Sequence, residues 1–253
     1  MALHVERLGS GPDLVLLHGW GLHAGVWDSL AARLAGTFRL HLIDLPGHGH
    51  SRDIPFGSLD AVTDAIAEYV PEGAGLCGWS LGGLVALRLA TRHPSRAAAL
   101  TLVSTTPCFV QRPDWPHAMA RKTLEEFAEG LRTGPAKTIR AFVNLNAFGG
   151  PQARDRMREL AALLVERGTP CAESLRAGLA VLHDTDLRGE VSSIDRPATV
   201  IHGGRDALAP VGAGRWLAGR LPFARFVEIA DAAHLPFVSH AGVVAQALET
   251  LHG

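Results

Sequence analysis

One short stretch limits strongly what this chain can fold into: residues 76–83 read Leu-Cys-Gly-Trp-Ser-Leu-Gly-Gly. Residues 74–77 are apolar, as in a buried strand, and apolar side chains after residue 83 recur at helical spacing. A Gly-x-Ser-x-Gly turn between a strand and a helix is the setting of a nucleophile elbow, which holds a serine at a sharp bend with its hydroxyl pointing out. Ser80 is therefore the candidate nucleophile. The alternative is a glycine-rich turn that serves packing alone.

The rest of the chain supplies the sheet that such an elbow needs. Helical patterns follow the elbow and also occur at residues 26–34, 58–70 and 241–251. Strands alternating with helices indicate an α/β fold, with a mostly parallel central sheet and helices on both faces. Buried strands are predicted at 13–17, 38–43, 74–77, 98–103, 198–202 and 223–229, with an edge strand at 3–8.

This alternation stops between residues 107 and 190. No convincing buried strand occurs there, and the helical patterns lie at 123–131, 136–145, 153–167 and 172–182. We expect residues 1–106 and 191–253 to form the core and residues 107–190 to form an inserted helical cap over the active site. Two segments of this insertion, 107–109 and 142–146, are either pocket walls or part of the cap's own core.

A serine hydroxyl is a poor nucleophile, so a base must accept its proton and a third group must orient that base. Asp206 and His234 each lie in a loop directly after a predicted strand, and the loops at the carboxyl ends of parallel strands meet at one edge of the sheet. The chain order serine, acid, histidine is that of an α/β-hydrolase triad. The less suitable acids and histidines are Asp186 in the cap, Asp195 before a strand, Asp231, His202 within a strand and His240.

A His-Gly pair, residues 18–19, closes the strand at 13–17. The loop after such a strand can supply one backbone N–H of an oxyanion hole, and the residue after the nucleophile supplies the other. We expect Trp20 and Leu81 to donate these two N–H groups. The alternative is an ordinary loop between strand and helix.

Composition excludes several other classes of protein. With 253 residues and a formal net charge of −1, the chain is neither disordered nor a generally basic nucleic-acid binder. Its three cysteines are too few and too scattered for a disulfide framework, and no long uncharged apolar run predicts a membrane span. His48 and His50 lack the partners of a metal site, so we expect no metal and no cofactor. A soluble cytoplasmic protein is expected, and a monomer.

Several motifs together resemble one family. The segments 18–22, 44–49, 78–83, 107–109 and 231–234 all match in register, and the chain resembles the pimeloyl-[acyl-carrier protein] methyl ester esterases over nearly its full length. The resemblance implies a serine carboxylesterase that removes the methyl ester from a pimeloyl chain carried on acyl carrier protein. Methanol would be released, and chain elongation for biotin synthesis would end.

The resemblance also implies binding residues. The substrate would lie near Trp20, Ser80, Leu81, Phe142, Val143, Asn144, Leu145, Asn146 and His234. The acidic carrier protein would dock on Lys137, Arg154 and Arg158, with Lys137 standing where the family pattern has arginine. Read without the family, residues 132–158 hold six basic residues against one acid, Asp155, which favours an acidic macromolecular partner. A merely solvated face is the alternative.

Two other functions remain open at this stage. One is a generalist carboxylesterase that acts on small, short-chain esters in the same fold. The other is a non-catalytic ligand receptor built on a hydrolase scaffold, a class in which the triad can persist.

Overall fold

The computed structural model describes residues 2–168 and 170–253, in which seven strands form one sheet. The strand order is β1-β3-β2-β4-β5-β6-β7, with β1 antiparallel to β3 and every other pair parallel. The mostly parallel sheet predicted from the sequence is confirmed. The strands are β1 (Val5–Leu8), β2 (Asp13–Leu17), β3 (Arg39–Ile43), β4 (Gly75–Trp79), β5 (Ala99–Val103), β6 (Pro197–Gly203) and β7 (Phe223–Ile229).

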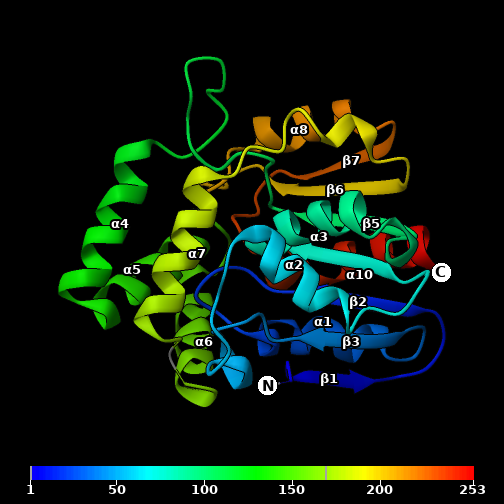
Figure 1. The fold of residues 1–253 in the computed structure, drawn as a ribbon, viewed down its shortest axis with the longest axis horizontal. Helices are drawn as coiled ribbons and strands as arrows, with labels where there is room; N and C mark the ends of the chain where they lie inside the picture. The colour runs from blue at the N-terminus through cyan, green and yellow to red at the C-terminus, as the bar shows by residue number, and fades with distance from the viewer. Residues whose placement is uncertain (1, 169) are drawn as a thin grey trace.

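Helices cover both faces of this sheet because its central strands are mostly apolar and are buried along their whole length. Every residue of β4 and β5 is buried. In Figure 1, α2 (Leu59–Ala67) and α3 (Leu81–Arg92) lie in front of the sheet, and α1 (Asp28–Leu34) and α10 (Ala241–His252) lie behind it. The remaining core helices are α8 (Val211–Arg220), which packs on β6 and β7, α9 (Pro236–Ser239), and the short 3₁₀ turns η1 (Ala24–Trp27), η2 (Gly49–Ser51), η3 (Pro94–Arg96) and η4 (Val191–Ser193).

The helix expected at residues 58–70 begins as predicted and ends early. Ser58 caps α2 by accepting a hydrogen bond from the Ala61 N–H at 3.2 Å. The helix ends at Ala67, three residues before the predicted end. Pro71 follows closely, and a residue that precedes proline is disfavoured in helical conformation.

The order of the strands opens a crevice at one place along the edge of the sheet. After β2 the chain moves outward to β3, and it then returns to place β4 on the other side of β2. The connections that leave β2 and β4 therefore separate, toward α1 behind the sheet and α3 in front of it. Ligand sites in open α/β sheets form at such a reversal of strand order. The loop with Trp20 and the elbow with Ser80 both begin there.

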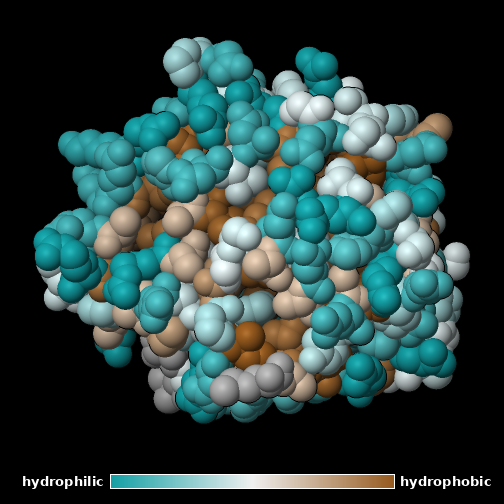
Figure 2. Space-filling view, viewed as in Figure 1, coloured by the Kyte–Doolittle hydropathy of each residue, from teal (hydrophilic) through white to brown (hydrophobic). Residues whose placement is uncertain are grey.

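Between β5 and β6 lie four helices, each at a position predicted from the sequence. They are α4 (Arg121–Thr133), α5 (Pro135–Ala147), α6 (Ala153–Glu166) and α7 (Ala172–Asp184), and the described part of residues 107–190 contains no strand beyond isolated bridges. We call residues 107–190 the insertion. Figure 1 shows its helices together at the left, beyond the edge toward which the arrowheads of β3 and β6 point. In Figure 2 apolar surface lies between these helices and the sheet, bordered by hydrophilic residues.

The length and hydropathy of the helices decide whether one of them could cross a membrane. Within residues 2–168 and 170–253, no helix combines the length and the apolar run needed to cross a bilayer.

Candidate active site

Ser80 occupies the sharp bend between β4 and α3 in a backbone conformation that non-glycine residues rarely adopt. Its φ is 55° and its ψ is −117°. Hydrogen bonds hold this bend: the Ser80 N–H donates to the Val103 carbonyl at 3.0 Å, and the Thr105 hydroxyl donates to the Ser80 carbonyl at 2.7 Å. Strain of this kind persists only where the surroundings enforce it, and it is concentrated at functional sites.

The glycines around Ser80 are required by close packing. A Cβ on Gly78 would lie 2.4 Å from the Gly82 carbonyl oxygen, and one on Gly82 would lie 2.2 Å from the Leu17 carbonyl oxygen. Both obstacles are backbone atoms, which cannot rotate away as a side chain could. The elbow therefore depends on glycine at these positions, and β2 lies directly beneath the start of α3.

Asp206 and His234 meet at the carboxyl end of β6 and β7. The imidazole Nδ1 of His234 lies 2.7 Å from Oδ2 of Asp206, so Nδ1–H donates to the carboxylate. The other carboxylate oxygen accepts the N–H groups of Leu208 and Ala209 at 2.9 Å and 2.8 Å. With Nδ1 protonated, Nε2 of His234 carries a lone pair. It has no hydrogen-bond partner within the described residues.

The electrostatics of this pair suit a general base with an orienting acid. Burial would raise the pKa of the Asp206 carboxyl, but the imidazole of His234 and hydrogen bonds to the carboxylate outweigh burial and hold the pKa below its usual value. Asp206 is therefore ionised at neutral pH. An ionised, buried carboxylate on Nδ1 fixes the tautomer and stabilises an imidazolium if one forms.

Trp79, the residue before Ser80, is hydrogen-bonded to His234. Its indole N–H donates to the His234 carbonyl at 2.8 Å, and the two rings lie 5.5 Å apart. No hydrogen bond joins the Ser80 hydroxyl to Nε2 of His234 in the described structure. Catalytic hydrogen bonds are often long in free enzymes and shorten when substrate binds, so the arrangement remains suited to proton transfer. Ser80 is 4% exposed and His234 1%, so both side chains are almost fully shielded from solvent.

The backbone N–H groups of Trp20 and Leu81, beside Ser80, have no acceptor within the described residues. Leu81 is the first residue of α3, where the helix dipole favours negative charge. The Trp20 loop touches the elbow, since a Cβ on Gly19 would lie 3.2 Å from the Ser80 Cβ. The Trp20 indole N–H donates to the Leu175 carbonyl of α7 at 2.9 Å, which ties this loop to the insertion.

The α5 residues suggested by the family resemblance divide into two groups. Phe142 packs edge-on against Trp20 with ring centroids 4.6 Å apart, and the Asn146 carbonyl accepts the His234 N–H at 3.2 Å. Val143 and Asn144 line a groove between α5 and α6, where Asn144 is exposed. Leu145 is half-buried. The structure therefore brings Phe142 and Asn146 to the site and turns Val143 and Asn144 to the other side of α5.

The segment at residues 107–109 is mostly occupied with local packing. Cys108 is buried in a small apolar cluster with Trp115, Ala118 and Ala213. Its carbonyl accepts the Trp115 indole N–H at 2.8 Å. Of the two interpretations left open by the sequence, this favours the insertion's own packing for Cys108.

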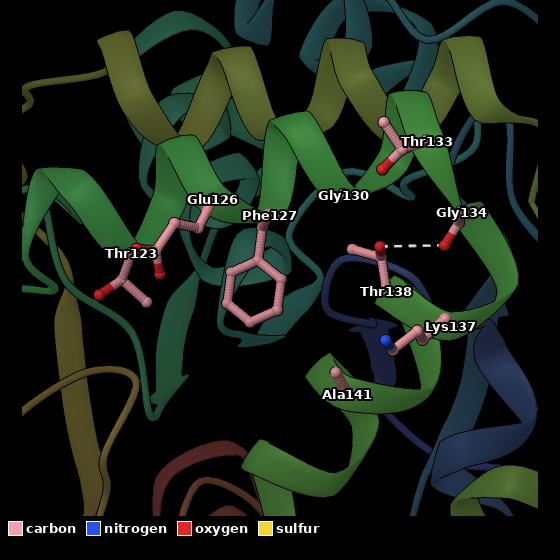
Figure 3. Close-up of a pocket in the computed structure, with 9 residues that line it drawn as sticks. All are labelled: Thr123, Glu126, Phe127, Gly130, Thr133, Gly134, Lys137, Thr138 and Ala141. Carbon is pink, nitrogen blue, oxygen red and sulfur yellow. Dashed lines mark hydrogen bonds between the residues drawn. The ribbon is translucent and has the colours of Figure 1, made fainter.

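A groove of about 480 Å³ lies between α4 and α5 (Figure 3). The Phe127 ring points into it from α4, and Lys137 stands on α5 at its side. Phe127 and Phe142 have ring centroids 5.7 Å apart, and Phe142 in turn contacts Trp20. Three aromatic rings thus connect the groove to the loop beside Ser80.

The six basic residues at 132–158 are not equivalent. Three have a carboxylate partner: Arg132 with Glu129 at 2.7 Å, Arg156 with Glu159 at 2.8 Å and Arg158 with Asp155 at 3.3 Å. The other three, Lys137, Arg140 and Arg154, are exposed and have no ion pair within the described residues. The free charge of the patch is therefore about half of what the sequence count suggests.

Sequence reasoning missed the residues that support the site from behind. Thr105 holds the Ser80 carbonyl, and Trp79 holds the His234 loop. Asp44 joins the loop after β3 to the loop after β2: its two oxygens accept the N–H groups of Ala24 at 2.7 Å and His50 at 2.8 Å. Only adjacency to the glycine-rich motifs could have signalled these roles.

The chain is similar to one protein family and to several individual proteins of known name. Residues 14–247 match the model of the "Alpha/beta hydrolase family". A Nitrosomonas europaea protein named "Pimeloyl-[acyl-carrier protein] methyl ester esterase" is 44% identical over 94% of each chain. Proteins of the same name from Chromobacterium violaceum and Stenotrophomonas maltophilia strain K279a are 46% and 43% identical, over 95% and 98% of this chain and 94% and 95% of theirs.

Solved structures share the fold at lower identity. An esterase from Exiguobacterium antarcticum superposes with a TM-score of 0.89 at 23% identity, covering 98% of this chain and 94% of that chain. An enol-lactonase from Burkholderia xenovorans LB400 superposes with a TM-score of 0.83 at 26% identity, covering 98% of this chain and 95% of that chain. A bromoperoxidase from Bacillus anthracis gives 0.87 at 20%, covering 98% and 94%. Proteins named for different reactions therefore share this architecture.

Proposed function

We propose that this chain is a serine carboxylesterase whose substrate is the methyl ester of pimeloyl-[acyl-carrier protein]. The premise is that the chain belongs to the alpha/beta hydrolase family and, within it, to the pimeloyl-[acyl-carrier protein] methyl ester esterases. The products are pimeloyl-carrier protein and methanol, in biotin synthesis, and the enzyme acts in the cytoplasm as a monomer without a cofactor. The observation that carries the proposal is the Asp206–His234 hydrogen bond at 2.7 Å, at the edge of the sheet that holds the strained Ser80; it leaves Nε2 without a partner among the described residues.

The mechanism follows from these groups. Nε2 of His234 takes the proton of the Ser80 hydroxyl as its oxygen attacks the ester carbonyl carbon, and Asp206 stabilises the imidazolium. The N–H groups of Trp20 and Leu81 receive the oxyanion, and each such donor lowers the barrier by about 3 kcal/mol in comparable enzymes. The tetrahedral intermediate expels methoxide, which takes the proton from His234 and leaves as methanol. Water then attacks the acyl-enzyme by the same route, and Ser80 is released.

The insertion supplies the binding surface in this proposal. Residues 107–190 form a cap on a core of residues 1–106 and 191–253, and the acyl chain passes Phe142 to reach Ser80. The groove between α4 and α5 is lined by Phe127, whose ring contacts Phe142, which in turn contacts Trp20. In this proposal the groove holds the arm that links the acyl chain to the carrier. Support for docking of the acidic carrier comes from Lys137 and Arg154, which are exposed and have no ion pair in the described part of the chain, with Arg158 one helical turn away from Arg154.

One experiment separates the specific esterase from its alternatives. The purified enzyme is offered pimeloyl-carrier-protein methyl ester and, separately, short p-nitrophenyl esters, and kcat/KM is compared. We expect the carrier-bound ester to be preferred and both activities to vanish in Ser80→Ala. A strong preference for the small esters would instead indicate a generalist. A protein that turns over neither ester, and whose Ser80 a fluorophosphonate does not label, would be a receptor.

A further inference from the structure

His48 lies outside the triad, yet it is fully buried and uses both ring nitrogens. It belongs to the loop between β3 and α2. Its Nδ1–H donates to the Pro46 carbonyl at 2.9 Å, and its Nε2 accepts the Gly21 N–H at 3.3 Å. Burial lowers the pKa of this imidazole to about 4, so the ring is neutral at physiological pH and Nε2 remains an acceptor.

His18 is a second buried histidine beside the same loop. Its Nδ1–H donates to the Gly19 carbonyl at 2.8 Å, and its Nε2 accepts the Leu45 N–H at 2.9 Å. Burial, and next the neighbouring His48, lower its pKa to about 3. The two rings lie 5.3 Å apart. Both histidines therefore have a fixed tautomer, with the proton on Nδ1.

The two hydrogen bonds hold the peptide groups on either side of Trp20. The Gly19 carbonyl and the Trp20 N–H belong to one planar trans peptide, so they point in opposite directions. Holding the carbonyl toward His18 directs the Trp20 N–H to the other side, where it has no acceptor within the described residues. The next peptide carries the Gly21 N–H, which His48 holds. The peptide groups before and after Trp20 are therefore both held, and neither can rotate freely to redirect the Trp20 N–H.

We propose that His18 and His48 are positioning residues, which orient the Trp20 N–H as an oxyanion donor through the Gly19 carbonyl and the Gly21 N–H. The inference rests on the proposed esterase function and deepens it. It gives His48, and with it the loop between β3 and α2, a role in the reaction through the Trp20 loop.

The test compares variants that remove each hydrogen bond with variants that keep it. His48→Gln places an acceptor near the position of Nε2, whereas His48→Leu has none. His18→Asn places a donor near the position of Nδ1, whereas His18→Leu has none. His41→Leu is the matched control, because His41 is a buried histidine on β3 that is hydrogen-bonded to Asp13 rather than to the Trp20 loop.

Two measurements separate positioning from general damage. The first is kcat and KM for a short p-nitrophenyl ester. The second is the Ki of a trifluoromethyl ketone, which adds to Ser80 and places an oxyanion between the same donors. We expect each leucine variant at positions 18 and 48 to lose about tenfold or more in kcat, against the 10²–10³ lost when such a donor is removed outright. KM should stay within about twofold, and Ki should rise in step with the fall in kcat.

The amide variants should recover most of the loss, and His41→Leu should show none. Leucine variants that fold and keep wild-type kcat and Ki would overturn the proposal, as would an equal loss in His41→Leu. If the leucine variants do not fold, His48→Gln is compared with His48→Asn, which is too short to reach Gly21, and equal activity of that pair overturns it. A wild type that turns over no ester overturns the esterase function and this inference together, whereas unaffected variants of an active wild type overturn this inference alone.

Discussion

The edge of the sheet and the insertion use polar groups in opposite ways. At the edge, Asp206 and His234 are buried, and both carboxylate oxygens of Asp206 and Nδ1 of His234 have defined partners. On α4 to α6 of the insertion, charges such as Lys137 and Arg154 face solvent, and the ion pairs Arg132–Glu129 and Arg158–Asp155 are exposed. Buried polar groups are costly unless they are paired, whereas exposed pairs contribute little. The edge is therefore specified atom by atom, and the insertion is specified by helix packing and overall charge.

Asp206→Asn should have the largest effect, because it acts at the buried edge. The amide would favour the wrong tautomer of His234, and kcat should fall by about 10⁴ while the protein stays folded. Steady-state kinetics with a p-nitrophenyl ester measures this. Asp231→Asn is the control, since that acid is exposed and contacts His240 instead. Similar losses in the two variants would contradict the assignment of the acid.

Gly82→Ala should be next, through stability. Its Cβ would lie 2.2 Å from the Leu17 carbonyl oxygen, and forcing β2 and α3 apart should lower the free energy of unfolding by about 3 kcal/mol. Gly219→Ala in α8 is the matched control, because nothing lies within 4 Å of the added methyl. That change should leave stability equal or raise it by about 0.5 kcal/mol. Urea unfolding followed by circular dichroism compares the two, and equal stabilities would refute the close approach.

Acid should destabilise the protein through the buried histidines. Burial holds the pKa of His18 at about 3 and the pKa values of His48 and His252 at about 4. At mildly acidic pH these three imidazoles therefore stay neutral in the folded protein, whereas they take up protons in the unfolded chain. Because these folded-state pKa values are lowered, stability is lost as pH falls below about 6.5, by about 2 kcal/mol per histidine at about pH 5. Urea unfolding at neutral pH and at about pH 5 measures this loss of stability. His252→Phe should remove one histidine's share, and an unchanged pH dependence would contradict the neutral state inferred for His252.

Charge reversal on the insertion should have the smallest effect and a selective one. Arg154→Glu with Arg158→Glu should lower kcat/KM for the carrier-bound ester by about tenfold and leave a p-nitrophenyl ester unaffected. The control is Arg7→Glu with Arg33→Glu, which changes the net charge by the same amount at exposed positions outside the insertion. Equal losses on both esters, or an equal effect of the control pair, would count against docking on α6.

The same contrast explains how far the sequence could be used for prediction. Period-two and period-3.6 patterns are local, so the strands at residues 13–17 and 223–229 and the four insertion helices were predicted within a few residues. The meeting of Asp206 with His234 followed from strand ends sharing one edge of the sheet. The Trp20 indole and its Leu175 acceptor are 155 residues apart in the chain, and the acceptor is a backbone carbonyl that carries no sequence signal.

The face that each α5 residue presents was equally hidden from the sequence. Residues 142–146 form slightly more than one helical turn, so they point in all directions around the axis. Which of them reach Trp20 depends on how α5 rotates against α4 and α6. That rotation is a property of the packed insertion, not of the segment.

The hydrogen bond from the Trp20 indole to the Leu175 carbonyl has a consequence for protein engineering. A new lid grafted onto this sheet to change the accepted acyl group would also replace the anchor of Trp20, whose amide is one of the two that we propose as donors to the oxyanion. A chimera of that kind needs a main-chain acceptor at the same place above the tryptophan, or its altered selectivity will come with slower turnover.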